Sequence, residues 1–142
     1  MKQDRIVQAL LWAFIAFGLA FAIVMLTGAL RADASFDGLQ TITTGTTDDG
    51  GVSVALTPRG IADGVLSFDI SINTHSVDLS GVDLARAAVL EYGATAVAPI
   101  AAPVMRGHHV DGTLSFPVGR VPSSFTVRVA GIPKERERVY RW

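Results

Sequence analysis

The chain has 142 residues, a formal net charge of −1, 49% hydrophobic residues and no cysteine. This length leaves room for one ordinary domain. The near-neutral charge and the lack of a basic, aromatic-rich stretch exclude the usual nucleic-acid-binding classes. Without cysteine the protein forms no disulfide and has no lipoprotein attachment site, so its folded part depends on its own core.

An uncharged, apolar run covers residues 6–30, "IVQALLWAFIAFGLAFAIVMLTGAL". A helix of this length spans roughly 37 Å, enough to cross a hydrocarbon core of about 30 Å with some tilt. Trp12 lies near the start of the run, where an interfacial aromatic residue is typical. The run therefore predicts a transmembrane signal-anchor helix that holds the chain in the lipid bilayer.

A cleaved signal peptide is the alternative interpretation. The start is basic, and residues 32–34, "ADA", have the small-residue pattern of a cleavage site. Apolar regions of signal peptides are usually about 7–15 residues long, much shorter than this run. Arg31 also separates the run from the candidate cleavage site. We favour the uncleaved anchor.

The flanks of the apolar run predict its orientation. Residues 1–5 carry Lys2 and Arg5 against one acid, Asp4, whereas the residues just after the run are not more basic. The positive-inside rule then keeps residues 1–5 in the cytoplasm and places residues 31–142 outside. The prediction is a single-pass protein of the cell membrane with its C-terminal domain outside the cytoplasm.

The segment that follows, residues 31–51, is rich in Thr, Asp and Gly and has little to bury. It is predicted to be a tether, with one edge strand at residues 39–43. The extracytoplasmic domain is then expected to cover residues 52–142.

Residues 52–142 have the pattern of β-strands. In residues 65–73, "VLSFDISIN", apolar and polar side chains alternate, which is typical of a half-buried strand. Residues 124–130 repeat this pattern, and residues 51–58 form a third run that Pro58 is expected to end. Shorter candidate strands are "AAVLEYG", "TAVAPIA", "GTLSFP" and "RVYRW".

Turn signals such as Asp63-Gly64 separate these runs. Seven or so short strands with regular turns predict an all-β fold, an immunoglobulin-like antiparallel β-sandwich, preceded by one N-terminal transmembrane helix. We expect one common core to be formed by Leu66, Phe68, Ile70, Ile72, Phe125, Val127 and Val129.

The three histidines of the chain lie in two polar stretches, "NTHSVDLSGVD" and "MRGHHVDG". His75 follows the best-patterned strand, and His108 and His109 precede the strand "GTLSF". In an antiparallel sandwich these positions can lie at the same end. Histidine is a common zinc and copper ligand. Carboxylates and a soft sulfur stand nearby, so a copper or zinc site is one hypothesis, with the candidate ligands His75, His108, His109, Asp78, Asp111 and Met105.

The other interpretation is structural. Neighbouring residues of a strand point to opposite faces, so His108 and His109 cannot both bind one metal without a bend. Asp78 can form an Asx turn, and "SGVD", from Ser80 to Asp83, resembles a capping box for a short helix. No strict metal-binding spacing is present, and both interpretations stay open.

No catalytic motif is found in the sequence. It has no nucleophile elbow, no Gly-rich phosphate loop and no His-Glu-x-x-His helix. His75 and Ser76 are adjacent, but a base and its nucleophile must meet through their side chains, which neighbouring residues rarely do. The protein is predicted not to be an enzyme.

Three motifs together carry a resemblance: Thr-His-Ser-Val-Asp-Leu at residues 74–79, Gly-His-His at 107–109, and the C-terminal "ERVYRW". In this combination the chain resembles a family of exported, membrane-anchored β-sandwich domains of bacteria and archaea, over about residues 52–142. The resemblance implies a β-sandwich and brings no established activity. Family members carry an aromatic residue shortly before Gly-His-His, where this chain has Met105.

The C-terminal "RVYRW" is expected to be a last edge strand whose aromatic residues close the core; a docking tail for a partner or the membrane surface is the alternative. Two functions are compatible with the whole sequence. The first is a tethered, non-catalytic interaction or accessory domain with a partner in a membrane complex. The second is a tethered metal-binding module for copper or zinc.

Overall fold

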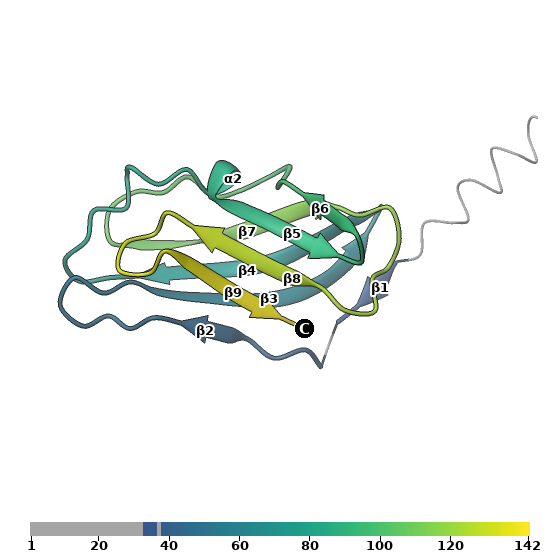
Figure 1. Cartoon of the computed structure of the whole chain (residues 1–142), viewed down its shortest axis with the longest axis horizontal. Coiled ribbons are helices and arrows are strands. Elements are labelled where there is room, and N and C mark those ends of the chain that lie inside the picture. Colours follow the sequence, from purple (N-terminus) through teal and green to yellow (C-terminus); the bar gives the residue numbers. More distant parts are fainter. Residues whose placement is uncertain (1–32, 37) are drawn as a thin grey trace, which may run out of the picture. The chain divides into compact units, whose positions relative to one another are not determined.

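Two β-sheets make up the folded part of the protein (Figure 1). The structure is a computed structural model, and it describes residues 33–36 and 38–142. Its helical and strand elements, in chain order, are β1 (Ala34–Ser35), β2 (Ile42–Thr44), β3 (Ser53–Ala62), β4 (Val65–Asn73), α2 (Leu84–Ala87), β5 (Ala88–Tyr92), β6 (Thr95–Val97), β7 (His109–Pro117), β8 (Thr126–Ala130) and β9 (Glu137–Arg141).

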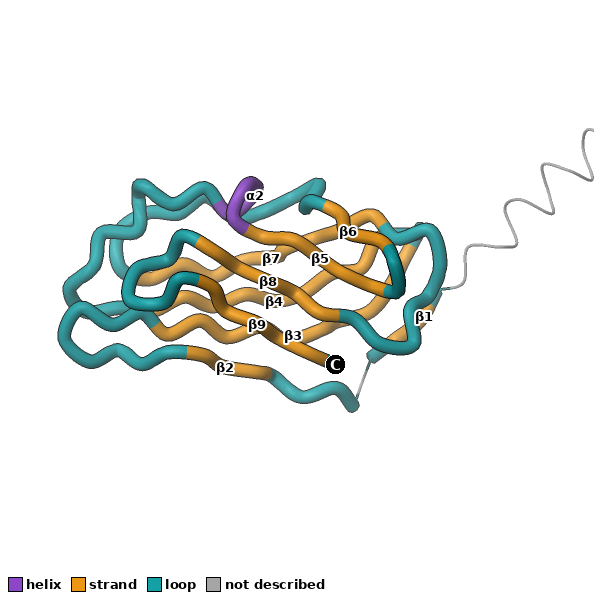
Figure 2. The backbone as a smooth tube through the Cα atoms, in the orientation of Figure 1, coloured by secondary structure: helices purple, strands orange, loops and turns teal. Residues whose placement is uncertain are grey.

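The first sheet has the strand order β1-β3-β4-β7, with β2 also paired to β3, and the second has the order β6-β5-β8-β9. All the pairings in both sheets are antiparallel. The predicted all-β architecture of two antiparallel sheets is therefore confirmed. The tube in Figure 2 shows one sheet lying over the other.

The long strands β3 and β4 form a hairpin through Asp63 and Gly64. Both residues have positive φ, 52° and 75°, which is the backbone of a type I′ turn. This turn matches the right-handed twist of paired strands, and Asp-Gly is one of the few dipeptides that adopts it readily. The bounds predicted for β4 from its alternation, residues 65–73, are those of the structure.

The sequence predicts that the strand beginning near residue 51 ends at Pro58, and for β3 this prediction is wrong. The strand continues to Ala62 through a register shift between Pro58 and Gly60. Pro58 lies between the residues of β3 that pair with β2 and those that pair with β1. The missing N–H of proline is tolerated at such an irregularity, because no continuous third strand needs it there.

The predicted tether is also corrected. Residues 31–51 were expected to be a linker with one edge strand, but two strands of this segment, β1 and β2, pair with β3. The expected edge strand at 39–43 is found as β2, shifted to Ile42–Thr44. The sandwich therefore includes part of the segment that its composition assigned to the tether.

The core lies between the two sheets. Each of the seven residues predicted to share it is buried, with at most 4% of its surface exposed. Phe68 stands at the centre of an aromatic group, with ring centroids 5.4–5.9 Å from those of Phe116, Phe125 and Trp142. Such pairs add roughly 0.5–1.5 kcal/mol each to the stability given by burial alone.

The C-terminal strand β9 closes one side of the sandwich, as the aromatic pattern of "RVYRW" predicted. Its inward side chains, and the indole of Trp142 just after it, bond to backbone carbonyls of the first sheet or of the segment before that sheet. Arg138 donates to Val52, Tyr140 to Val54 and the Trp142 indole to Gln40, at 3.1, 3.2 and 2.9 Å. These contacts join the two sheets along an edge that shares no backbone ladder.

The Tyr140 hydroxyl lies within this seam. It is 2.7 Å from the Thr44 hydroxyl, and burial raises the pKa of Tyr140 to about 12. A tyrosine in the unfolded chain has a pKa of about 10. The raised folded-state pKa means that Tyr140 contributes its stability below pH 10 and loses it as the pH rises towards 12.

We therefore expect Tyr140→Phe to lower the free energy of unfolding by about 1–2 kcal/mol at neutral pH, because the buried Val54 carbonyl loses its donor. The difference from the parent protein should shrink above pH 10. Urea unfolding at several pH values measures both effects. A variant as stable as the parent at pH 7 would contradict the proposed role of the hydroxyl.

Within residues 33–36 and 38–142 no helix is long and apolar enough to span a membrane. The transmembrane helix predicted for residues 6–30 lies outside the described residues.

Candidate functional site

Polar loops gather at one end of the sandwich, which we call the loop pole (Figure 2). It consists of residues 45–52 before β3, 74–83 after β4, 106–108 before β7, and 131–136 between β8 and β9. The start of β7 pairs with the end of β4, His109 opposite Asn73. The described chain enters at the other end, where Asp33 accepts a hydrogen bond from the Asp63 turn.

The loops of the loop pole are bonded to one another. The buried Thr74 hydroxyl donates to the Gly51 carbonyl at 2.7 Å, and the Gly50 N–H donates to the Ser76 hydroxyl at 2.8 Å. Lys134 donates to the carbonyl of Asp49, also at 2.8 Å. Three loops far apart in the sequence are thus held in one arrangement.

Two residues of the Thr-His-Ser-Val-Asp-Leu stretch, Thr74 and Leu79, stabilise the fold of the loop. Thr74 and Leu79 have no exposed surface. The Thr74 hydroxyl also accepts hydrogen bonds from the N–H groups of Ser76 and Val77, which tightens the turn after β4. The N–H of Leu79 donates to Gly107, so this turn is tied to the Gly-His-His stretch.

The histidines themselves lie at the surface of the loop pole. His108 donates from Nδ1 to the carbonyl of Val77 at 2.9 Å, and Nδ1 of His109 is 2.8 Å from Oδ1 of Asn73. His75 is exposed in the loop that follows β4. The prediction that the three histidines share one end is confirmed, and two of them have hydrogen-bonding roles there.

The two aspartates after β4 make local bonds. Oδ1 of Asp78 accepts from the N–H of Ser80 at 2.9 Å, the predicted Asx turn, and this bond lowers the pKa of Asp78, with a smaller effect from His108. Asp83 accepts from Ala85 as the N-cap of α2. The expected capping box from Ser80 is wrong: the helix begins after Asp83, whose own carboxylate caps it.

The other two candidate ligands, Met105 and Asp111, differ in exposure. Met105 is buried, with 4% of its surface exposed, and Asp111 is exposed on β7, opposite Ser71. In the part of the chain that the structure describes, no three His, Asp or Glu side chains form a group able to hold a metal ion. Copper or zinc binding stays a prediction.

Arg138 is the residue at this pole that sequence reasoning missed. Its side chain is fully buried and donates to the carbonyls of Ile132, Pro133 and Val52, each at 3.1 Å. Its Nε has no hydrogen-bond partner among the described residues, and the nearest carboxylate oxygen, of Glu135, is 3.9 Å away. The strand pattern could have revealed it, because residue 138 is separated by two and four positions from Tyr140 and Trp142 and therefore shares their inward face.

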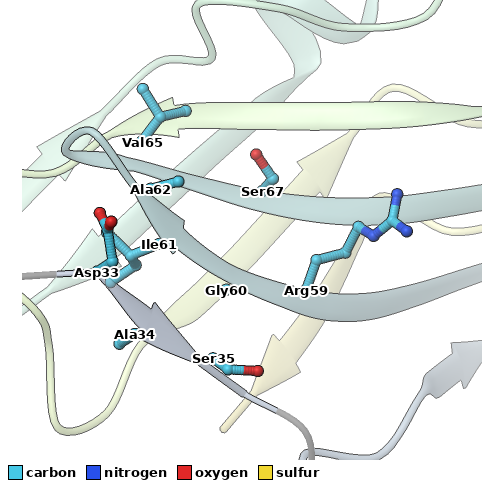
Figure 3. A pocket seen from close by; sticks show the side chains of 9 residues that line it. All are labelled: Asp33, Ala34, Ser35, Arg59, Gly60, Ile61, Ala62, Val65 and Ser67. Atoms are coloured by element: carbon cyan, nitrogen blue, oxygen red, sulfur yellow. The ribbon is translucent and has the colours of Figure 1, made fainter.

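Two open hollows lie on the outer face of the first sheet, away from the loop pole. The larger, about 460 Å³, is next to β1 and is shown in Figure 3, where Arg59 reaches away from Asp33. Arg59 instead bonds Asp69 at 3.2 Å. The lining of the second hollow, about 340 Å³, mixes apolar residues of β3, β4 and β7 with hydroxyl residues and with Asp69 and Asp111. Among the described residues, no hydroxyl of either hollow is hydrogen-bonded to a carboxylate of the same hollow.

The metal hypothesis makes a testable prediction. If the histidines are structural, copper(II), copper(I) and zinc(II) should each leave the melting temperature of the protein unchanged at neutral pH. A ligand that binds only the folded state raises the melting temperature by mass action. We expect no such rise in differential scanning calorimetry.

The contrary result has a clear signature. A rise that grows with metal concentration, disappears below about pH 6 and is lost in His75→Ala or His108→Ala would establish the metal site. His109→Ala tests whether the second histidine of the Gly-His-His stretch is also a ligand. The Nδ1 atom of His109 is already hydrogen-bonded to Asn73.

No protein-family model matches the chain, and neither a curated protein nor a solved structure is significantly similar to it.

Proposed function

We propose that the protein is a membrane-tethered, extracytoplasmic β-sandwich that acts as a non-catalytic interaction domain of a membrane complex, and that the loop pole is its contact surface. The observation that carries the proposal is the network of hydrogen bonds between loops 45–52, 74–83 and 131–136. Loops that are already ordered lose little conformational entropy when a partner binds, which favours affinity.

The polar character of the loop pole supports a protein partner. Its exposed side chains mix both charges and imidazole, among them Asp48, His75, Arg106 and His108. A contact area of this kind gives specificity through charge complementarity. It lies at the opposite end of the sandwich from Asp33, the first residue that the structure describes.

The strand order supports an immunoglobulin-like sandwich. If β3, β4 and β7 are named A, B and E, then β5, β8 and β9 become C, F and G. The immunoglobulin fold has A, B and E in one sheet and C, F and G in the other. In that fold the loops between B and C and between F and G form a binding end, and these are the loops 74–83 and 131–136.

Site-specific photo-crosslinking tests the contact surface. We expect a benzophenone side chain at position 48 or 75 to link the protein to a partner in intact cells, as a discrete band of higher mass. The control is the same group at Thr113, which is exposed on the outer face of the first sheet. Equal labelling from all three positions, or none from the loop pole, would rule out this surface.

The tether is tested separately. The apolar run of residues 6–30 and the basic residues before it support an uncleaved anchor with the domain outside. Protease added to right-side-out vesicles should then remove a C-terminal tag, and the N-terminal tail should stay with the membrane. Protection of the tag until lysis would overturn the orientation, and loss of the N-terminal tail during export would favour the cleaved signal peptide.

A further inference from the structure

The outermost strand of the second sheet, β9, has a free backbone edge (Figure 1). Phe125 and Trp142 exchange two backbone hydrogen bonds of 3.0 Å. Bonded and non-bonded pairs alternate along an antiparallel ladder. With the observed register, the N–H and C=O groups of Glu137, Val139 and Arg141 point away from β8. No hydrogen bond within the described residues reaches these groups.

The other edge strands of the two sheets are shorter than β9 or, in the case of β7, partly covered. β7 is covered at Ser115, which exchanges backbone bonds with Ala101, and the outer edge of β3 is paired with β1 and β2. β6 has three residues, whereas β9 has five. An uncovered strand edge is a template for another strand.

The outward side chains of β9 have charges complementary to those of a second, antiparallel β9 strand. Glu137, Val139 and Arg141 share the outer face, because Arg138 and Tyr140 point into the core. In an antiparallel pair of two β9 strands centred on Val139, each Glu137 stands opposite the Arg141 of the other copy. Opposite charges in such directly facing positions stabilise a pair, and the three residues whose backbone groups are free are the ones that face each other.

The ion pairs on this face leave charges available for such a contact. Arg128 lies between Glu91 and Glu137, at 3.0 and 2.8 Å, and both contacts raise the pKa of Arg128. One cation with two carboxylates leaves this group a net charge of −1. Arg141 is exposed and has no ion pair among the described residues. The surplus charges of two copies would cancel across the shared edge.

We propose that two copies of this chain associate through antiparallel pairing of their β9 strands, centred on Val139, so that the second sheets of both copies form one continuous sheet. The proposal is independent of the proposed role of the loop pole. The charges at this edge select another β9 in one register, and the backbone groups supply the hydrogen bonds.

Cysteine cross-linking of the full chain tests the register. The protein has no cysteine, so Val139→Cys supplies one thiol in each copy. Directly opposed residues with exchanged bonds have Cα atoms about 5.5 Å apart, within the range that a disulfide bridges. In detergent with mild oxidant, we expect Val139→Cys to form a covalent dimer at least about tenfold faster than Ala96→Cys, an exposed position on the other edge strand, β6.

Charge reversal tests the complementarity. With Val139→Cys present, Arg141→Glu alone places acids opposite acids, and Glu137→Arg alone places bases opposite bases. Each should lower the rate of dimer formation about tenfold. A mixture of the two variants restores both opposite-charge contacts, so heterodimers should form at a rate close to that of Val139→Cys alone. Different tags on the two variants identify the heterodimer by mass.

The outcomes are distinct. Faster linkage at position 139, loss of linkage in each reversed variant and recovery in the mixture support the paired edge. Equal rates of covalent dimer formation at positions 139 and 96 would overturn the proposal, and so would rates that do not change when the charges are reversed. Either result would also be obtained if the chains associate through another surface. The Arg141 side chain makes no hydrogen bond or ion pair among the described residues, so Arg141→Glu decides the charge test even if Glu137→Arg folds poorly because Arg128 loses one of its two partners.

Discussion

Replacing Ile70 by Asp should unfold the domain. Ile70 lies in the middle of β4 with 1% of its surface exposed, and its side chain belongs to the core between the sheets. A carboxylate there has no cation to pair with and no water. Removing such a charge from water without a partner costs several kcal/mol or more, comparable to the whole stability of a small domain, about 5–15 kcal/mol.

Circular dichroism and urea unfolding measure this effect. We expect the variant to lack a cooperative unfolding transition at neutral pH and to recover part of its structure at low pH, where the carboxyl is neutral. Thr43→Asp is the matched control, because Thr43 is an exposed residue of β2 and should change stability by about 0.5 kcal/mol or less. A stable Ile70→Asp variant would contradict the core assignment.

Arg138→Ala should be the second most damaging change, by about 3–5 kcal/mol. The guanidinium supplies donors to three carbonyls, those of Val52, Ile132 and Pro133. Removing it leaves these acceptors without a partner beneath the loop pole and opens a cavity. Arg138→Lys should recover only part of the loss, since one ammonium cannot reproduce the planar fork of donors.

Two further variants separate the causes. Arg138→Met fills most of the volume without donors, so the difference between Met and Ala measures packing, and the remaining loss measures the hydrogen bonds. Arg136→Ala removes an exposed arginine two residues earlier and should be nearly neutral. If Arg138→Met were as stable as the parent, the buried cation would not stabilise the base of the loop pole.

The destabilisation caused by Arg138→Ala should extend to the loop pole. Arg138 joins the β8–β9 loop to Val52, next to the loop whose Gly50 and Gly51 contact the turn after β4. Amide hydrogen exchange should therefore increase in residues 45–52 and 131–136 before it increases in β4. An even increase over the whole domain would show that the loops have no cooperative unit of their own.

Local pattern was sufficient wherever a residue's role depends on its neighbours in the chain. Alternation alone predicted β4 over 65–73 and the inward residues of β8. The Asp63-Gly64 turn followed from the φ values that this dipeptide tolerates. The common end for the three histidines followed from the same logic, because antiparallel strands bring the end of one beside the start of the next.

Elements that depend on a partner distant in sequence could not be predicted in this way. Residues 34–35 carry no strand pattern, yet they form β1 because β3 offers them a free edge. Pro58 was expected to end β3, and the strand continues because its neighbours on that side change at this point from β2 to β1. In the predicted metal set, sequence proximity did not show that Met105 is buried while His108 and His109 bond to Val77 and Asn73.

The sequence by itself determined the all-β class, the two-sided alternation that builds the core and the strand that carries Arg138, Tyr140 and Trp142. Only the tertiary structure decided what those three side chains do. An arginine in a C-terminal charged run is expected to be solvated. Here the carbonyls of Val52, Ile132 and Pro133 converge on it, and this convergence exists only once the two sheets have packed.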